Sequence, residues 1–345
     1  MGVISAMKNN ICSSLLIFLS SVGMLCGNDA LGETDSRPPP NEHLSKPAQQ
    51  MMLNMARMPV FDPVAQYNST RGAGIEPPAR PMMQKIEGEY DVSPVQTNST
   101  LSYWITSPQQ TDASRVILFV HGGAYIFGDA GKMIELPLRL GRAAGMKVLS
   151  VNHRLAPENP WPAALNDCLD AHAWLIEQGY SPDSIAWVGI SSGGGIVLSM
   201  ANAAKQQDIP LPGAIYAMSA WADMTVSGDS YVVNNPLGQG PGKGSKIKAL
   251  ADMYVGDADP YEPTISPMYG DLGGLPPTLI DAGSRELFLS DSTRWARRAT
   301  LAGVDVTLNI WDGMWHGFHI MPNIPEAQEV TEDGATFLKA HLTIN

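Results

Sequence analysis

From about residue 88 onward, the chain alternates between short apolar runs and segments with helical periodicity. The apolar runs are rich in β-branched and aromatic residues, as in strands of a sheet, and lie at 101–106, 115–120, 147–153, 184–190, 213–221, 276–283 and 304–311. Segments with apolar residues at helical spacing lie between or after them, at 161–178, 192–206, 291–303 and 325–342. Strands that alternate with helices predict an α/β protein with a mostly parallel sheet and helices on both of its faces.

The N-terminal part has a different pattern. Lys8 precedes an apolar run at 11–25 that only serines and one glycine interrupt. This run is short for a membrane span and is typical of the core of a signal peptide. We therefore predict a leader over 1–30 and a secreted or periplasmic protein, with no stable membrane span once the leader is removed. Leu25 is bulky where lipid attachment at Cys26 would need a small residue, which argues against a lipid anchor.

Further composition shifts divide the rest of the chain. Residues 31–47 contain few apolar residues and a proline triplet, which predicts a linker. The segment 48–87 begins with a Met-rich stretch of helical spacing and becomes irregular, rich in Pro and Gly, over 59–84. We interpret it as part of a cap over the main domain at 88–345. A long polar excursion at 222–265 interrupts that domain and could contribute to the same cap.

Composition narrows the classes of partner. The chain has 345 residues, of which 44% are hydrophobic and 16% charged, enough for one large domain with a decorating subdomain. A net charge of −12 argues against nucleic acid as a partner. Cys12 and Cys26 lie in or beside the predicted leader, so that Cys168 remains alone and no internal disulfide can form. Its place in an apolar helical pattern predicts an inert core thiol.

A G-x-S-x-G motif lies between the strand at 184–190 and the helix at 192–206. Its glycines are Gly189 and Gly193, and its central residue is Ser191. A sharp strand-to-helix turn needs tiny neighbours two positions away on either side, which selects Ser191 rather than Ser192 as a nucleophile. The backbone N–H of Ser192 would then face an oxyanion at the helix N-terminus. The alternative is a glycine-rich turn in which serine merely caps the helix.

A second glycine-containing loop follows the buried strand at 115–120. Its small residues are Gly122, Gly123 and Ala124, whose backbone N–H groups can point at a ligand without obstruction. We predict that these groups and that of Ser192 form an oxyanion hole. The alternative is an ordinary Gly-Gly turn. His121, which precedes the loop, is expected to be structural because its place in the chain order does not suit a base.

His316 lies between glycines in a loop after the last predicted strand, where a base could be presented. In strand-to-helix serine sites of this kind the base follows the acid, which follows the serine. We therefore predict His316 as the base, with His319 as the competitor, which has an apolar residue after it and could begin a helix. The two histidines could also suggest a metal site, but no carboxylate or cysteine cluster accompanies them, so we predict no metal.

Three carboxylates follow the strand at 276–283 or end it. Asp281 is expected to end the strand, and Asp291 is expected to cap the next helix together with Ser290. Glu286 lies on the loop between them, where a carboxylate can fix the tautomer of the base and stabilise its imidazolium. Glu286 is the predicted acid, and Asp291 is the second candidate.

With these motifs in order, residues 115–320 resemble the hormone-sensitive-lipase-like (family IV) carboxylesterases of the α/β-hydrolase superfamily. The resemblance is carried by "VHGGAY", "VNHRLAPENPWPAALND", "GISSGG", "SPMYGDLGGLPPTLIDAGSRELFLSDS" and "DGMWHGF". The chain departs from the family pattern at Ala124, which replaces a glycine, and at Ile190, which replaces an aspartate. Its acid region follows the branch with a GS-x-E pattern, which places Glu286 on the family acid.

The resemblance implies an eight-stranded sheet, a mobile cap and hydrolysis of short- to medium-chain acyl esters through Ser191, Glu286 and His316, without cofactor or metal. The partner would be a small-molecule ester. A lactone hydrolase or a lipase for longer chains would use the same residues, as would a peptidase or amidase, and a non-catalytic small-molecule receptor is the alternative from another class. The strand at 304–311 could be an edge at which two copies pair as a homodimer.

Overall fold

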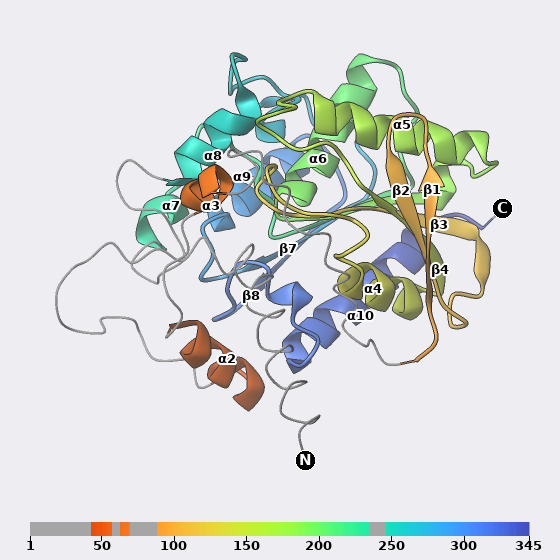
Figure 1. Ribbon diagram of the computed structural model, residues 1–345, viewed down its shortest axis with the longest axis horizontal. Helices are drawn as coiled ribbons and strands as arrows, with labels where there is room; N and C mark the ends of the chain where they lie inside the picture. Colours follow the sequence, from red (N-terminus) through yellow and green to blue (C-terminus); the bar gives the residue numbers. More distant parts are fainter. Residues whose placement is uncertain (1–42, 57–62, 70–87, 235–245, 345) are drawn as a thin grey trace.

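A computed structural model describes residues 43–56, 63–69, 88–234 and 246–344, which build one sheet with helices on both faces (Figure 1). Within these residues the sheet has eight strands in the order β1-β2-β4-β3-β5-β6-β7-β8. They are β1 (Asp91–Gln96), β2 (Leu101–Thr106), β3 (Asp112–Val120), β4 (Met146–Val151), β5 (Ile185–Ile190), β6 (Ala214–Met218), β7 (Thr278–Gly283) and β8 (Val306–Trp311). Only the β1–β2 and β2–β4 pairs are antiparallel, so the predicted α/β-hydrolase architecture with a mostly parallel eight-stranded sheet is confirmed.

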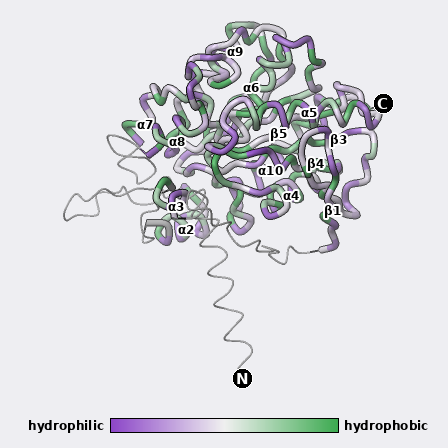
Figure 2. The backbone as a smooth tube through the Cα atoms, turned by 45° about the horizontal axis from the view of Figure 1, so that its top comes forward, coloured by the Kyte–Doolittle hydropathy of each residue, from purple (hydrophilic) through white to green (hydrophobic). Residues whose placement is uncertain are grey.

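The α-helices of the described residues divide between the two faces of this sheet. They are α2 (Lys46–Ala56), α3 (Pro63–Ser69), α4 (Glu135–Ala144), α5 (Ala163–Glu177), α6 (Ser192–Gln206), α7 (Ser230–Val233), α8 (Lys246–Val255), α9 (Leu289–Leu301) and α10 (Pro325–His341). Apolar residues of α4 and α10 belong to one core cluster, and those of α5, α6 and α9 belong to another. Figure 2 shows the outer helices alternating between hydrophobic and hydrophilic positions, as expected for helices that bury one face.

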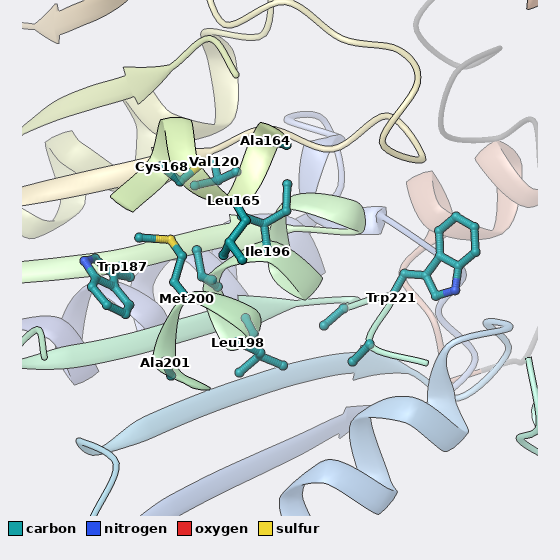
Figure 3. Close-up of a cluster of buried hydrophobic side chains, with 14 of the residues drawn as sticks. Val120, Ala164, Leu165, Cys168, Trp187, Ile196, Leu198, Met200, Ala201 and Trp221 are labelled. Carbon is teal, nitrogen blue, oxygen red and sulfur yellow. The ribbon is translucent and has the colours of Figure 1, made fainter. Parts of the chain in front are cut away.

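The two core clusters follow the pleat of the central strands. Along β3, Leu118 and Val120 belong to one cluster, whereas Ile117 and Phe119 belong to the other. Successive side chains of a strand point to opposite faces, so a strand covered on both sides must be apolar at every position. This explains the continuous apolar runs of the sequence. Cys168 of α5 is fully buried in the cluster that contains Leu118 and Val120 (Figure 3), which confirms the predicted core thiol.

Strand β1 and helix α4 were not expected from the sequence. The strand β1 is the outer, antiparallel edge of the sheet and contains Pro94, which lacks a backbone donor and is tolerated only at such edges. The helix α4 contains Pro137 in its first turn and Gly141 near its end, two residues that weaken a helical pattern. Gly141 is needed there because a Cβ atom on it would lie 2.9 Å from the carbonyl oxygen of Met146.

The structure corrects the expected end of one strand and the expectation that one segment is irregular. The strand expected at 213–221 ends at Met218, because the chain turns at Ser219, whose φ is +46°. The segment 59–84, expected to be irregular, contains α3, which begins at Pro63. Proline suits the first helical position, and Val64 and Tyr67 of this short helix pack against the core, so tertiary contacts stabilise it.

The N-terminal helices lie at different places on the domain. Ser45, just before α2, donates hydrogen bonds from its N–H and hydroxyl to the carboxylate of Glu326 in α10. The helix α3 instead contacts α8, which belongs with α7 to the excursion at 222–265 (Figure 1). The predicted leader at 1–30 and most of the linker at 31–47 lie outside the described residues. No helix within the described residues is long and apolar enough to span a membrane.

Candidate active site

Ser191 occupies a strained turn between β5 and α6. Its φ of +58° and ψ of −122° are rare for a residue with a side chain. A Cβ atom on Gly189 would lie 2.2 Å from the carbonyl oxygen of Gly193, and one on Gly193 would lie 2.1 Å from that of Val120. The prediction that both positions must be tiny is therefore confirmed. The turn presents the Ser191 side chain at the N-terminus of α6, where the helix dipole stabilises negative charge.

The structure brings His316 and Glu286 to this serine. His316 Nε2 lies 2.9 Å from Ser191 Oγ, and His316 Nδ1 lies 3.5 Å from Glu286 Oε2. His316 is 5% exposed, Ser191 is 5% exposed and Glu286 is fully buried. The ring of Phe288 contacts the imidazole edge-on, with 4.9 Å between the ring centroids. A hydroxyl, an imidazole and a carboxylate therefore lie in series in a place with little access to water.

The loop of Gly122, Gly123 and Ala124 lies against the same serine. A Cβ atom on Gly122 would be 3.1 Å from Ser191 Cβ. Gly123 has a φ of +131° and Ala124 a φ of +55°, so the loop turns sharply. Among the described residues, none accepts a hydrogen bond from the N–H groups of Gly123, Ala124 or Ser192. Buried N–H groups are usually paired, so this cluster of free donors is suited to bind an oxyanion.

His121 supports the loop from beneath. Its Nδ1 lies 2.8 Å from the carbonyl oxygen of Gly122, and its ring stacks on that of His153 with 4.2 Å between centroids. Burial, together with the neighbouring His153, lowers the pKa of His121 to about 3. The ring is therefore neutral at ordinary pH. This arrangement fits the structural role expected for His121.

The two other candidate carboxylates are placed elsewhere. Asp281 lies within β7, where it accepts a hydrogen bond from Trp311 Nε1 at 3.1 Å, and burial raises its pKa to about 6. Asp291 lies in the first turn of α9, but the expectation that it caps this helix is wrong. Its Oδ2 atom accepts hydrogen bonds from the N–H groups of Ala222 and Asp223 and from the Tyr231 hydroxyl, each at 2.9 Å.

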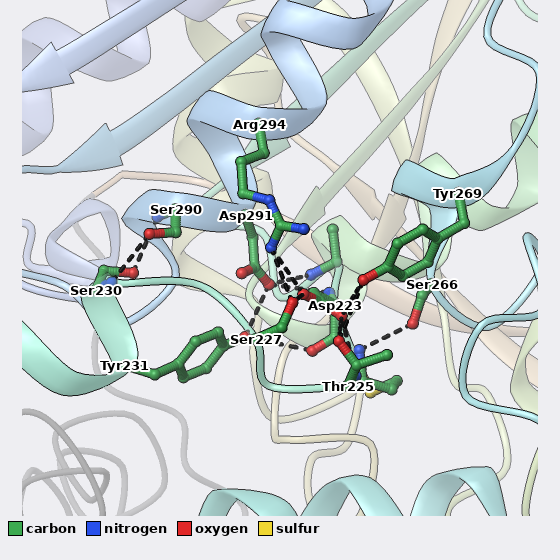
Figure 4. A network of polar contacts seen from close by, with 12 residues as sticks. Asp223, Thr225, Ser227, Ser230, Tyr231, Ser266, Tyr269, Ser290, Asp291 and Arg294 are labelled. Carbon is green, nitrogen blue, oxygen red and sulfur yellow. Dashed lines mark hydrogen bonds and ion pairs between the residues drawn. The ribbon is translucent and has the colours of Figure 1, made fainter.

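Asp291 thus belongs to a buried polar network that the sequence did not reveal (Figure 4). Next to it, Asp223 Oδ2 lies 3.0 Å from Arg294 Nη1 and accepts a hydrogen bond from the Ser227 hydroxyl. Burial raises the pKa of Asp291 well above its usual range, and the nearby charge of Asp223 adds to this effect. The network joins the start of the excursion at 222–265 to α9, immediately behind the loop that carries Glu286.

His319 does not reach the site as a base. It lies in the short 3₁₀ turn η6 (Phe318–Ile320) rather than at the start of an α-helix. Burial lowers its pKa well below the usual value, and neither ring nitrogen has a hydrogen-bond partner among the residues that the structure describes. In the described part of the chain, no group of three or more His, Cys, Asp or Glu residues could hold a metal ion.

Residues 117–320 match a family model described as an alpha/beta hydrolase fold. An acetyl-hydrolase of Streptomyces hygroscopicus is 33% identical over 278 residues, which cover 78% of this chain and 91% of that protein. An esterase of Acinetobacter venetianus is 32% identical over 236 residues, which cover 66% of this chain and 76% of that protein.

Solved structures are similar over most of the chain. A crystal structure of an esterase from the bacterial hormone-sensitive lipase family is 32% identical, with a TM-score of 0.73 and coverage of 85% of this chain and 96% of that chain. The structure of EstE5 after soaking with p-nitrophenyl butyrate is 31% identical, with a TM-score of 0.70 and coverage of 81% and 98%.

The close approach at Gly193 generates a prediction about stability. Gly193→Ala should lower the free energy of unfolding by about 3 kcal/mol, because the new methyl group would overlap the backbone of β3. Gly194→Ala is the matched control, since its nearest heavy atom would be the Ala220 side chain at 3.0 Å, and it should cost about 1 kcal/mol or less. Urea unfolding followed by circular dichroism measures both; equal stability of the two variants would contradict the steric argument.

The raised pKa of Asp281 generates a prediction about pH. The folded protein keeps a proton that the unfolded chain releases above about pH 4, so this stabilising contribution is present at low pH and is lost as pH rises through about 6. Asp281→Asn should therefore gain stability relative to wild type between pH 4 and 7, by up to about 3 kcal/mol.

Chemical unfolding at several pH values tests this expectation. The exposed Asp257→Asn serves as the control and should keep a constant difference from wild type. A difference between Asp281→Asn and wild type that does not change with pH would refute the assignment.

Proposed function

The chain belongs to the hormone-sensitive-lipase-like family of the α/β-hydrolase fold, and on this premise we propose that it is a serine carboxylesterase acting on short- to medium-chain acyl esters. Ester hydrolysis is the activity named for its relatives, an acetyl-hydrolase and several esterases. The observation that carries the proposal is the 2.9 Å contact between His316 Nε2 and Ser191 Oγ at a strained strand-to-helix turn. No cofactor or metal enters the reaction.

The reaction begins with proton transfer. His316 Nε2 accepts the Ser191 proton while Ser191 Oγ attacks the ester carbonyl carbon. Glu286 lies at the other ring nitrogen, where its negative charge stabilises the imidazolium that forms. His316 then gives the proton to the alcohol oxygen, the bond between acyl carbon and alcohol oxygen breaks, and the acyl group remains on Ser191. A water molecule, deprotonated by His316, attacks the acyl carbon and releases the acid and the free serine.

The negative charge of each tetrahedral intermediate falls on the former carbonyl oxygen. We assign its stabilisation to the N–H groups of Gly122, Gly123, Ala124 and Ser192, because the Gly122–Ala124 loop packs against Ser191 and Ser192 is the first residue of α6. Ala124 supplies the same N–H group as a glycine would, so the departure from the family pattern leaves the donor set complete. The loss of one such donor typically lowers kcat by roughly 10²–10³.

A panel of p-nitrophenyl esters from acetate to palmitate tests the proposal. Wild type should be most active on acyl chains of about two to eight carbons, whereas Ser191→Ala and His316→Asn should lose roughly 10⁴-fold or more in kcat. Glu286→Gln should lose roughly 10²–10⁴-fold while remaining folded, because it keeps the shape but not the charge. Asp291→Asn should keep kcat near wild type, because Asn retains an acceptor oxygen for the hydrogen bonds from Ala222, Asp223 and Tyr231.

The outcomes separate the alternatives. A maximum at long chains would favour a lipase, and cleavage of matched amides as fast as esters would favour a peptidase or amidase. A folded wild type that hydrolyses no ester or lactone at all would overturn the enzymatic proposal and point to a receptor. Full activity of Glu286→Gln together with loss in folded Asp291→Asn would transfer the acid role to Asp291.

We also propose that β8 is the edge at which two copies pair. It is the last strand of the sheet, and Ile310 on it is 41% exposed. The opposite edge, β1, carries Pro94 and is less suited to pairing. Sedimentation velocity should find a dimer for wild type and a monomer for Ile310→Asp. The control Leu101→Asp, at an exposed position of β2, should remain dimeric; a monomeric wild type would refute this proposal.

A further inference from the structure

Ser219 lies directly behind the proposed catalytic residues and contacts two of the loops that carry them. It is the first residue after β6 and is fully buried. Its hydroxyl donates a hydrogen bond to Glu286 Oε2 at 2.6 Å, and it accepts one from the N–H of Gly317 at 3.3 Å. One hydroxyl group therefore joins the carboxylate to the residue that follows His316.

The contacted oxygen is the one that faces the base. Glu286 Oε2 lies 3.5 Å from His316 Nδ1, whereas Glu286 Oε1 has no hydrogen-bond partner among the described residues. A carboxylate can present either oxygen, and rotation about its last bond has a broad, shallow preference. In this site the strongest directional contact of the Glu286 side chain is the Ser219 hydroxyl. That contact decides which oxygen faces the imidazole and at what distance.

The backbone around Ser219 is held against the nucleophile. The N–H of Ser191 donates to the carbonyl oxygen of Met218 at 2.9 Å, and the N–H of Trp221 donates to that of Ser191 at 3.0 Å. The N–H of Ser219 donates to the carbonyl oxygen of Asp281 at 2.7 Å, which fixes its left-handed backbone with φ of +46°. The segment 218–221 therefore contacts the nucleophile, the carboxylate and the loop of the base together.

The backbone of Glu286 is fixed separately. Asn234 Nδ2 donates to its carbonyl oxygen at 2.7 Å, and Ser230 and Ser290 exchange hydrogen bonds beside it (Figure 4). Removal of the Ser219 hydroxyl should therefore leave the loop that carries Glu286 in place and change only the orientation of the Glu286 carboxylate. The expected consequence is a change in catalysis with little change in substrate binding.

From this geometry we propose that Ser219 is a positioning residue that aims Glu286 Oε2 at His316 and ties the His316 loop to the acid. The proposal rests on the esterase function proposed above. Ser219 contacts neither substrate nor reacting atoms, so it acts entirely through Glu286 and Gly317. Its contribution should therefore depend on the charge of Glu286.

A double-mutant cycle tests this dependence. Ser219→Ala should lower kcat by about 10- to 100-fold with KM within about twofold, because a hydrogen bond to a charged group is lost. In a Glu286→Gln background the same change should alter kcat by less than about twofold, since the effect acts through the carboxylate. A similar loss in both backgrounds would overturn the proposal, as would wild-type kcat in Ser219→Ala.

Two further variants separate the hydroxyl from its surroundings. Ser219→Gly removes the hydroxyl but suits the left-handed backbone, so it should lose kcat as Ser219→Ala does; full activity would mean that the backbone, not the hydroxyl, matters. Ser184→Ala is the matched control, because Ser184 is equally buried and donates to the carbonyl oxygen of Ser181, away from the site. It should keep wild-type kcat.

Proton NMR spectroscopy tests the proposal without a measurement of turnover. The Nδ1–H proton of His316 should give a far-downfield proton NMR signal when it faces the carboxylate. Ser219→Ala should shift or broaden this signal and Ser184→Ala should not. A signal that is unchanged in Ser219→Ala would refute the positioning role even if wild type cleaved no ester, whereas an inactive wild type with the expected shift would count against the esterase function alone.

Discussion

The close approach of α6 to the sheet is the constraint on which the rest of the site depends. Three glycines permit this approach: Gly189 in β5 faces the helix, Gly193 in α6 faces β3, and Gly195 in α6 faces the chain after β6. A Cβ atom on any of them would overlap backbone atoms. This short separation between α6 and the sheet accommodates the Ser191 turn. The turn places the serine oxygen at the N-terminus of α6, next to the N–H of Ser192. Backbone hydrogen bonds keep Ser191 in this strained conformation: its N–H donates to Met218, and its carbonyl oxygen accepts from Trp221.

The parallel sheet gathers the remaining groups. Strands β3, β5, β7 and β8 run in the same direction, so the loops that follow them meet at one edge. The Gly122–Ala124 loop, Ser191, Glu286 and His316 follow these four strands in turn, although Gly122 and His316 are far apart in the sequence. Charge that develops there is stabilised by groups already in place, because the surroundings are buried and cannot reorganise like water.

Three carboxylates, Asp223, Asp291 and Glu286, are buried near the site, and they differ in their hydrogen-bond partners. Asp291 and Asp223 are occupied by backbone N–H groups, hydroxyls and Arg294, and they join the excursion after β6 to α9. Glu286 Oε2 accepts the hydrogen bond from Ser219 and is also the oxygen that lies 3.5 Å from His316 Nδ1. Buried polar groups need such partners, so the network of Asp223 and Asp291 anchors the excursion to α9.

Local patterns in the sequence were sufficient for every strand except β1, for the helices α5, α6, α9 and α10, and for the glycine spacing, because apolar periodicity and steric exclusion act within a few residues. They placed Ser191, the Gly122–Ala124 loop and His316 on the correct connections. They favoured Glu286 but kept Asp291, five residues away, as a second candidate, and they did not reveal Ser219, which the pattern assigned to the interior of a strand. The different surroundings of Glu286 and Asp291 depend on contacts between residues 60 or more positions apart. Only the tertiary structure decides these hydrogen-bond partners, because distant parts of the chain supply them, whereas periodicity is a local property.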